Sequence, residues 1–256
     1  VRSRGLGDVY KRQVNLTLND GDFCTVIGGN GAGKSTTLNA IAGVWPVDCG
    51  QILIDGKDIS ALPEHKRAPY LGRVFQDPMT GTVADMEIIE NLAIAARRGK
   101  KRGLSWGVKA DERLRYRQML AEFDLGLEDR MSSKVGLLSG GQRQAITLLM
   151  ATIKKPKLLL LDEHTAALDP KTAAKVLELS DKIIAENNLT ALMVTHNMHD
   201  AITHGNRLIM MSDGKIILDI SGEEKKNLTV EHLLEMFEKA SGSKLENDRM
   251  LLSKDK

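Results

Sequence analysis

The sequence contains little cysteine, few aromatic residues and almost no excess of charge. Of its 256 residues, 2 are Cys and 4% are aromatic, and the formal net charge is +2 at pH 7. The two cysteines show neither a paired framework nor metal-type spacing, which argues against a disulfide-rich fold and favours a reducing setting. A charge so close to zero gives no general reason to expect a nucleic-acid or anionic-membrane partner. No apolar stretch approaches the roughly 20 residues that span a bilayer.

Hydrophobic residues make up 42% of the chain, enough to bury the core of one large domain or two small ones. Residues 14–18 alternate apolar and polar side chains, which favours a strand, and a buried strand then ends at Gly28. Further along, strand-like segments such as 73–77 and 157–163 alternate with segments of helical spacing. This alternation predicts an α/β fold with a mostly parallel sheet covered by helices.

Three parts are expected along the chain. Residues 1–13 are basic and follow neither a strand nor a helix period, so we expect them to be a leader that is not native to the domain. The main domain is expected over residues 14–222, with a helical insert at about 80–140. Residues 223–256 are expected to hold one amphipathic helix, near 230–240, and a polar tail.

A glycine-rich segment follows the first buried strand. Residues 28–35, GGNGAGKS, fit the pattern G-x-x-x-x-G-K-[ST] between a predicted strand and a predicted helix. Glycines let successive backbone N–H groups turn inward, and Lys34 supplies positive charge to the β- and γ-phosphates of a nucleotide. The Ser35 hydroxyl is then placed to bind Mg²⁺. The segment is therefore interpreted as a phosphate loop, against the alternative of a plain glycine-rich turn.

An acidic pair ends a later hydrophobic strand, KLLLLDE. Asp162 is expected at the carboxyl end of that strand, where it can hold Mg²⁺. Glu163 is one residue further along, so its side chain points elsewhere, toward the position of an attacking water. Ligand sites of open parallel sheets gather at such strand ends, which favours this interpretation over a solvated turn.

Between these two motifs lies the sequence Leu138-Ser139-Gly140-Gly141-Gln142, followed by a predicted helix. With it, the chain closely resembles the stand-alone ATP-binding subunits of ABC transporters over about residues 14–219. The remaining elements appear in the family's order: Gln76 after a short strand, the turn that ends at Asp169, and His196 after the strand ALMVT.

The resemblance implies a P-loop ATPase whose mostly parallel sheet carries a small antiparallel β subdomain and a helical insert. Glu163 and His196 would be catalytic, and Mg²⁺ would be bound by Ser35, Gln76 and Asp162. The residues that would contact ATP belong to the motifs just described: Gly28, Asn30, Gly31, Ala32, Gly33, Lys34, Ser35, Thr36, Gln76, Ser139, Gly140, Gly141, Gln142 and Asp169.

The family also implies partners. A second ATP-binding subunit, expected to be an identical copy, would pair head to tail so that the LSGGQ segment of each closes over the nucleotide of the other. Transmembrane permease subunits and an extracytoplasmic solute-binding protein would complete an importer of amino acids or similar small solutes, with this subunit peripheral on the cytoplasmic face of the membrane. No nucleic-acid partner is expected. The alternative is a soluble ABC-type ATPase that acts on nucleic acid or ribosomes.

Three features depart from the family pattern or fit it poorly. In the turn DEHTAALD, His164 and Ala166 stand where the family commonly has Pro and Ser. The aromatic residue that stacks on adenine has only Tyr10 as a candidate here, and Tyr10 is too close to Lys34, so the role is not assigned to it. The basic run at 97–107 contains a Trp that could stack on a base, but a solvated loop near an anionic membrane surface is favoured.

Overall fold

The computed structural model describes residues 13–100 and 107–241, which divide between two units. The first unit combines the described residues up to Glu64 with those from Thr190 onward, and the second runs from His65 to Leu189. The greater part of the expected leader, including Tyr10, lies outside the described residues, as do Trp106 and most of the expected polar tail.

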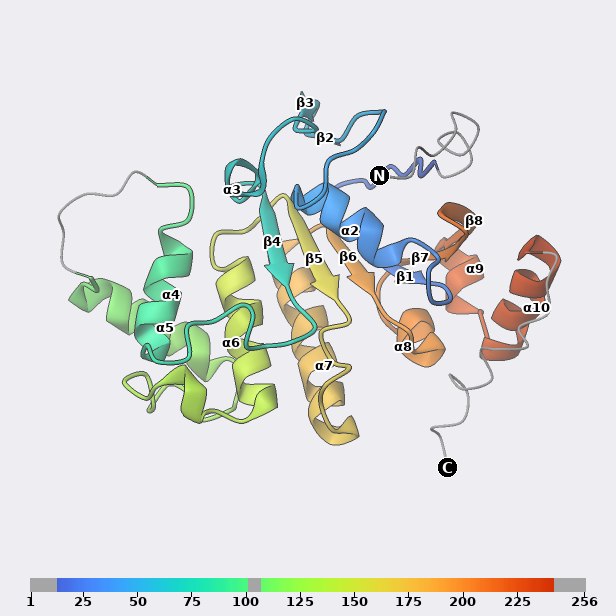
Figure 1. Ribbon diagram of the computed structural model, residues 1–256. Coiled ribbons are helices and arrows are strands. Elements are labelled where there is room, and N and C mark those ends of the chain that lie inside the picture. The colour runs from blue at the N-terminus through green and yellow to red at the C-terminus, as the bar shows by residue number, and fades with distance from the viewer. Residues whose placement is uncertain (1–12, 101–106, 242–256) are drawn as a thin grey trace. The chain divides into compact units, whose positions relative to one another are not determined.

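Four strands of the first unit lie side by side in the order β6-β1-β7-β8 (Figure 1). They are β1 (Phe23–Ile27), β6 (Ala191–Val194), β7 (Arg207–Ser212) and β8 (Lys215–Ser221). Strand β1 is parallel to both of its neighbours, whereas β7 and β8 form an antiparallel hairpin. Every residue of β1 and β6 is buried, as expected for near-continuous apolar runs in the interior of a parallel sheet.

The helices of the first unit are α2 (Lys34–Ala42), α8 (Met198–Thr203), α9 (Gly222–Lys226) and α10 (Val230–Ser241). Helix α10 is the amphipathic helix that the sequence predicts near 230–240. Its Leu233 and Phe237 join Ile220 of β8 in one hydrophobic cluster. The helix therefore packs on the strand hairpin and contributes to the core of this unit.

A second, two-stranded sheet of the first unit pairs β2 (Leu53–Ile54) with β3 (Lys57–Asp58) in antiparallel fashion. This is the small antiparallel β element that was expected. The strand predicted over 14–18 is wrong, because these residues form no regular element. The Thr17 carbonyl instead accepts a hydrogen bond of 2.6 Å from the Arg207 guanidinium, so a side chain takes the place of a neighbouring strand.

In the second unit, β4 (Leu71–Val74) runs parallel to β5 (Leu158–Asp162), with Val74 opposite Leu161. The sequence placed the first of these strands at 73–77, two residues too late. Gln144 donates a hydrogen bond of 3.2 Å to the Phe75 carbonyl, so the chain has left the strand ladder by that residue.

The helices of the second unit are α4 (Ile88–Ala96), α5 (Ala110–Ala121), α6 (Gly140–Thr152) and α7 (Pro170–Asn187), with a 3₁₀ turn η1 (Val135–Leu137) and the short α3 (Glu64–Arg67) at the sequence boundary between the units. Helix α6 packs on α4, α7 and β4. Within the described ranges, the chain forms no helix that is both long and apolar enough to cross a bilayer.

Candidate functional site

The phosphate loop of the first unit connects the carboxyl end of β1 to the first turn of α2. Gly28, Gly31 and Gly33 have φ values of +152°, +81° and +102°, a backbone region that other residues rarely adopt. At Gly28, a Cβ atom would also collide with the carbonyl oxygen of Met211 on β7. Glycine is therefore required by backbone conformation at all three positions and, at Gly28, also by space.

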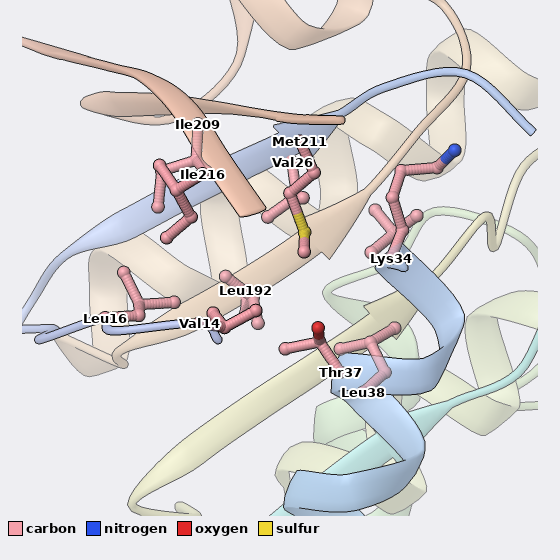
Figure 2. A pocket seen from close by; sticks show the side chains of 11 residues that line it. Val14, Leu16, Val26, Lys34, Thr37, Leu38, Leu192, Ile209, Met211 and Ile216 are labelled. Atoms are coloured by element: carbon pink, nitrogen blue, oxygen red, sulfur yellow. The ribbon is translucent and has the colours of Figure 1, made fainter. Parts of the chain in front are cut away.

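The Lys34 side chain closes the loop from inside. Its Nζ donates hydrogen bonds to the carbonyl oxygens of Gly28, at 2.5 Å, and Gly29, at 3.1 Å. The residue is only 8% exposed. Figure 2 shows its ammonium directed away from the small apolar cavity beneath the loop, which is lined by residues such as Leu38 and Leu192. The apolar lining thus keeps the charged end of Lys34 on the loop side.

The loop has the features needed to bind an anionic ligand such as a nucleotide phosphate. Its backbone is curled by left-handed glycines, the first turn of α2 contains no acidic side chain, and Ser35 and Thr36 are exposed there. A helix N-terminus with an adjacent ammonium group favours a negatively charged ligand. The loop therefore fits the phosphates of a nucleotide.

The tip of the β7–β8 hairpin supports the phosphate loop. The sequence did not predict this contact. Gly214, at the turn, donates a backbone hydrogen bond of 2.9 Å to the Ala32 carbonyl. A Cβ on Gly33 would lie 3.2 Å from the Cα of Gly214. An Asp-Gly pair such as Asp213-Gly214 favours a hairpin turn, but nothing in that dipeptide indicates what the turn contacts.

His196 follows β6, the parallel neighbour of β1. Val26 lies opposite Val194, and the Thr195 N–H donates to the Val26 carbonyl at 3.1 Å. Since the carboxyl ends of parallel strands meet at one edge of a sheet, His196 emerges at the same edge as Gly28, and it is exposed. The first unit therefore brings the phosphate loop and the histidine expected to be catalytic to one edge.

The second unit gathers Gln76, Asp162 and Glu163 at the carboxyl ends of its two strands. Asp162 is the last residue of β5, and Glu163 comes next with a φ of +45°. Gln76 lies two residues beyond β4 and is exposed. The register of β4 and β5 thus brings the glutamine and the two carboxylates to the same edge.

Asp162 is paired with a residue that the sequence did not single out. The Arg73 guanidinium donates to a carboxylate oxygen of Asp162 at 3.3 Å and also stacks on the Phe75 ring, 4.6 Å from its centroid. Burial raises the pKa of Asp162, and the hydrogen bond from Arg73 opposes that rise. The sequence could not predict the role of Arg73, because a single basic residue inside a short strand belongs to no recognisable motif.

Carboxylate, hydroxyl and amide oxygens are the ligand types that Mg²⁺ prefers. Asp162 and Gln76 supply two of these types in the second unit, and Ser35 supplies the third in the first unit. Each unit thus carries donors of a kind that suits Mg²⁺.

The LSGGQ segment forms the start of α6. Ser139 is the N-cap: its hydroxyl accepts from the Gln142 N–H at 3.3 Å, and the Gln142 side chain accepts from the Ser139 N–H at 3.3 Å. Gly140 is exposed, whereas Gly141 is buried, and a Cβ there would collide with the Thr172 side chain of α7. The segment thus presents Ser139 and Gly140 outward, while Gln142 completes the helix cap.

The acidic turn of the second unit, residues 163–169, ends at the N-cap of α7. The Asp169 carboxylate accepts a hydrogen bond of 3.1 Å from the Thr172 N–H, and hydrogen bonding to Thr172 lowers the pKa of Asp169. Leu168, just before it, lies beside Gly140. The acidic turn and the LSGGQ segment therefore lie against each other within this unit.

The described part of the basic run makes contacts within the chain. Arg97 donates to both carboxylate oxygens of Glu112, at 3.0 and 3.3 Å, and so ties α4 to α5. Arg98 donates to the Ala151 carbonyl at 3.2 Å. These two arginines are therefore engaged in holding helices together.

A family model described as ABC transporter matches residues 11–166. A tyrosine transport ATP-binding protein of Clostridioides difficile is 47% identical, over 89% of this chain and 90% of that protein. The spermidine/putrescine import ATP-binding protein PotA of Haemophilus ducreyi is 37% identical over 86% of this chain, which spans only 57% of that relative.

Solved structures give the same fold. An ATP-binding cassette of an ABC transporter in its ADP conformation superposes with a TM-score of 0.71 at 29% identity, covering 87% of this chain and 89% of that one. The dimeric post-hydrolysis state of a cassette bound to ADP and phosphate superposes with a TM-score of 0.68 at 31% identity, covering 81% and 88% of the two chains.

Proposed function

The chain belongs to the ABC transporter family. On this basis we propose that it drives the uptake of amino acids or similar small solutes. Its fold is the expected α/β P-loop fold, and it is an ATP-binding, ATP-hydrolysing subunit of a membrane transporter. The substrate class rests on one observation, the high identity to a tyrosine transport ATP-binding protein along almost the whole length of both chains.

The phosphate loop would hold the triphosphate of ATP. Its backbone N–H groups, Lys34 and the hydroxyls of Ser35 and Thr36 would neutralise and orient the phosphates. Asn30 and Gly31 would contribute the exposed part of the loop, and Ala32 its buried part. Ser35, Gln76 and Asp162 would hold Mg²⁺, which offsets negative charge on the phosphate oxygens when bound.

Glu163 would position and deprotonate the attacking water, and His196 would contact the γ-phosphate. Support comes from their places: each emerges from a buried strand at the edge where its unit gathers its other candidate site residues. A carboxylate so placed can accept the proton of the attacking water, whereas an imidazole can donate to a phosphate oxygen.

A second copy of the chain would complete each site. Ser139 and Gly140 face outward at the start of α6, where the helix N-terminus favours an anion. We assign Ser139, Gly140, Gly141 and Gln142 to the nucleotide of the partner copy, and Asp169 to nucleotide binding within the turn where the copies meet. The permease, an extracytoplasmic solute-binding protein and a place on the cytoplasmic face of the membrane complete the proposal.

The catalytic assignment is tested with Glu163→Gln. This variant keeps the shape of the side chain but removes the base, so ATP binding is retained while phosphate release falls by at least about 100-fold. Dimers accumulate on ATP, as size-exclusion chromatography would show. Near-normal phosphate release would overturn the role of Glu163.

The transport assignment needs a cellular test. Cells that lack the chain are expected to lose high-affinity uptake of radiolabelled tyrosine or a related amino acid, and the wild-type chain restores it while Lys34→Ala does not. Unchanged uptake of every amino acid tested would contradict the substrate class. Copurification with ribosomes in place of a membrane protein would contradict transport altogether.

A further inference from the structure

His164, which follows Glu163 in the chain, is a buried polar residue with no role in the steps above. It is 2% exposed. Burying an imidazole carries a free-energy cost unless its nitrogen atoms are hydrogen-bonded. The residue occupies a position at which the resembling family commonly has proline, so the turn here lacks the restraint on φ that a proline ring provides.

The imidazole is anchored on α7. Its Nε2 lies 3.1 Å from the Ser180 hydroxyl, whose oxygen lies 2.8 Å from the Val176 carbonyl oxygen. A hydroxyl has one hydrogen and a carbonyl can only accept, so Ser180 donates to Val176 and accepts from His164. The proton of the imidazole that points at α7 is therefore on Nε2, and Ser180, 1% exposed, is fully enclosed with it.

The residue that this anchor adjoins has an unfavourable backbone conformation. Glu163 has a φ of +45°, a left-handed conformation that costs a non-glycine residue about 1–2 kcal/mol. Such a conformation persists only when its surroundings fix it. On one side Glu163 is joined to Asp162, which is part of β5, and on the other to His164, which is fixed to α7. Its carbonyl also accepts a turn hydrogen bond of 3.0 Å from the Ala166 N–H.

We propose that His164 is a positioning residue: its hydrogen bond to Ser180 holds Glu163 in the left-handed conformation that aims its carboxylate at the attacking water. The proposal rests on the role of Glu163 proposed above. Here the side-chain hydrogen bond to α7 restrains the turn, in place of the φ restraint that a proline ring would provide. Helix α7 also contacts the LSGGQ segment through Thr172, so both the proposed base and the LSGGQ segment are held by α7.

The test compares Ser180→Ala and His164→Leu, which remove the hydrogen bond, with His164→Gln, whose amide can donate from a similar position. Thr152→Val is the matched control. Its hydroxyl is also buried, and it donates to the carbonyl four residues earlier, Leu148, at 2.8 Å, as that of Ser180 does. It lies at the far end of α6 from the LSGGQ segment and has no link to Glu163.

Steady-state phosphate release and ATP binding are measured on each variant at saturating Mg²⁺. Ser180→Ala and His164→Leu are each expected to lower kcat about tenfold, because a small displacement of a catalytic group has effects of this order. ATP affinity should change less than twofold. His164→Gln and Thr152→Val should keep near wild-type kcat, and the double variant Ser180→Ala, His164→Leu should be no slower than either single variant.

Wild-type kcat in Ser180→Ala, or a loss that Thr152→Val shares, would overturn the positioning role and leave a purely structural contact. Should His164→Leu fail to fold, Ser180→Ala with its control decides alone. Glu163→Gln is assayed in parallel: if it retains turnover, the proposed base is wrong, whereas if it is inactive and Ser180→Ala is normal, only the positioning role fails.

Discussion

Backbone groups fix the phosphate loop of the first unit, whereas side chains from other segments add to the backbone hydrogen bonds that hold the acidic turn of the second unit. The loop depends on left-handed glycines, on carbonyls that receive the Lys34 ammonium and on the backbone bond from Gly214. In the second unit, Arg73 binds Asp162 just before the acidic turn, and Ser180 binds His164 within it.

This difference determines what sequence can reveal. A backbone-built site restricts its own residues to glycine, so the restriction appears as a motif. A side-chain-built site depends on partners from distant segments, and many residue pairs can serve as an anchor. We therefore expect a single substitution to damage the backbone-built loop more than the side-chain-built turn.

The largest effect is expected when the backbone-built region is broken. In Gly28→Ala the new Cβ collides with the Met211 carbonyl oxygen of β7, which cannot move without distorting the strand. ATP affinity, measured by titration with a fluorescent nucleotide, should fall at least about 100-fold, because the loop can no longer close on the phosphates.

Gly50→Ala is the control for backbone strain alone. Gly50 has a φ of +92° and no atom within 4 Å of a built Cβ. It should lose only about 1–2 kcal/mol of stability and keep its ATP affinity. Equal ATP affinities for the two variants would show that the collision at Gly28 does not matter.

A smaller effect is expected where two neighbouring glycines of the LSGGQ segment differ. Gly141→Ala collides with the Thr172 side chain, so urea denaturation should show a loss of about 1–3 kcal/mol. Gly140→Ala meets only the flexible end of Leu168, at 3.2 Å, and should lose less than about 0.5 kcal/mol. The reverse order would contradict the packing of α6 on α7.

The smallest effect concerns an ion pair at the start of β7, at the end of the strand away from the phosphate loop. Arg207 binds Asp219 with two hydrogen bonds, of 2.8 and 2.6 Å, which lower the pKa of Asp219. A lowered carboxylate pKa stabilises the fold above the ordinary value and loses that contribution as the pH falls through the lowered one. Asp219→Asn should thus cost under about 1 kcal/mol at pH 7, since the carboxylate is partly exposed to solvent.

Urea titrations from pH 7 downward check this prediction. The difference in unfolding free energy between wild type and Asp219→Asn should shrink as the pH drops below the ordinary carboxylate range. A difference that grows on acidification would show that the pair does not stabilise the folded chain.

The sequence was sufficient for the elements whose cause is local. Apolar runs placed the strands β5 and β6 to within two residues. The sequence failed for residues 14–18, because alternation creates a strand only if a neighbouring strand pairs with it, and the Arg207 side chain takes the Thr17 carbonyl instead.

Within the site, the phosphate loop and the acidic pair were predictable from their motifs, but their supports were not. Arg73 reaches Asp162 from the neighbouring strand, and Ser180 lies 16 residues beyond His164, so both contacts depend on tertiary packing. His164 had one visible signal, the replacement of proline. Its function as an anchor could be seen only once the imidazole was found buried against α7.

The central claim is that one copy carries two complementary half-sites, a phosphate loop and an LSGGQ segment, each of which is completed by the opposite half-site of a second copy. The most direct measurement is phosphate release from a mixture of two inactive variants, Lys34→Ala and Gly140→Val. Mixed dimers contain one site in which both halves are intact, so the mixture should recover up to about a quarter of wild-type turnover, while each variant alone stays inactive. Full activity of Gly140→Val alone, or a mixture no more active than its components, would contradict the claim.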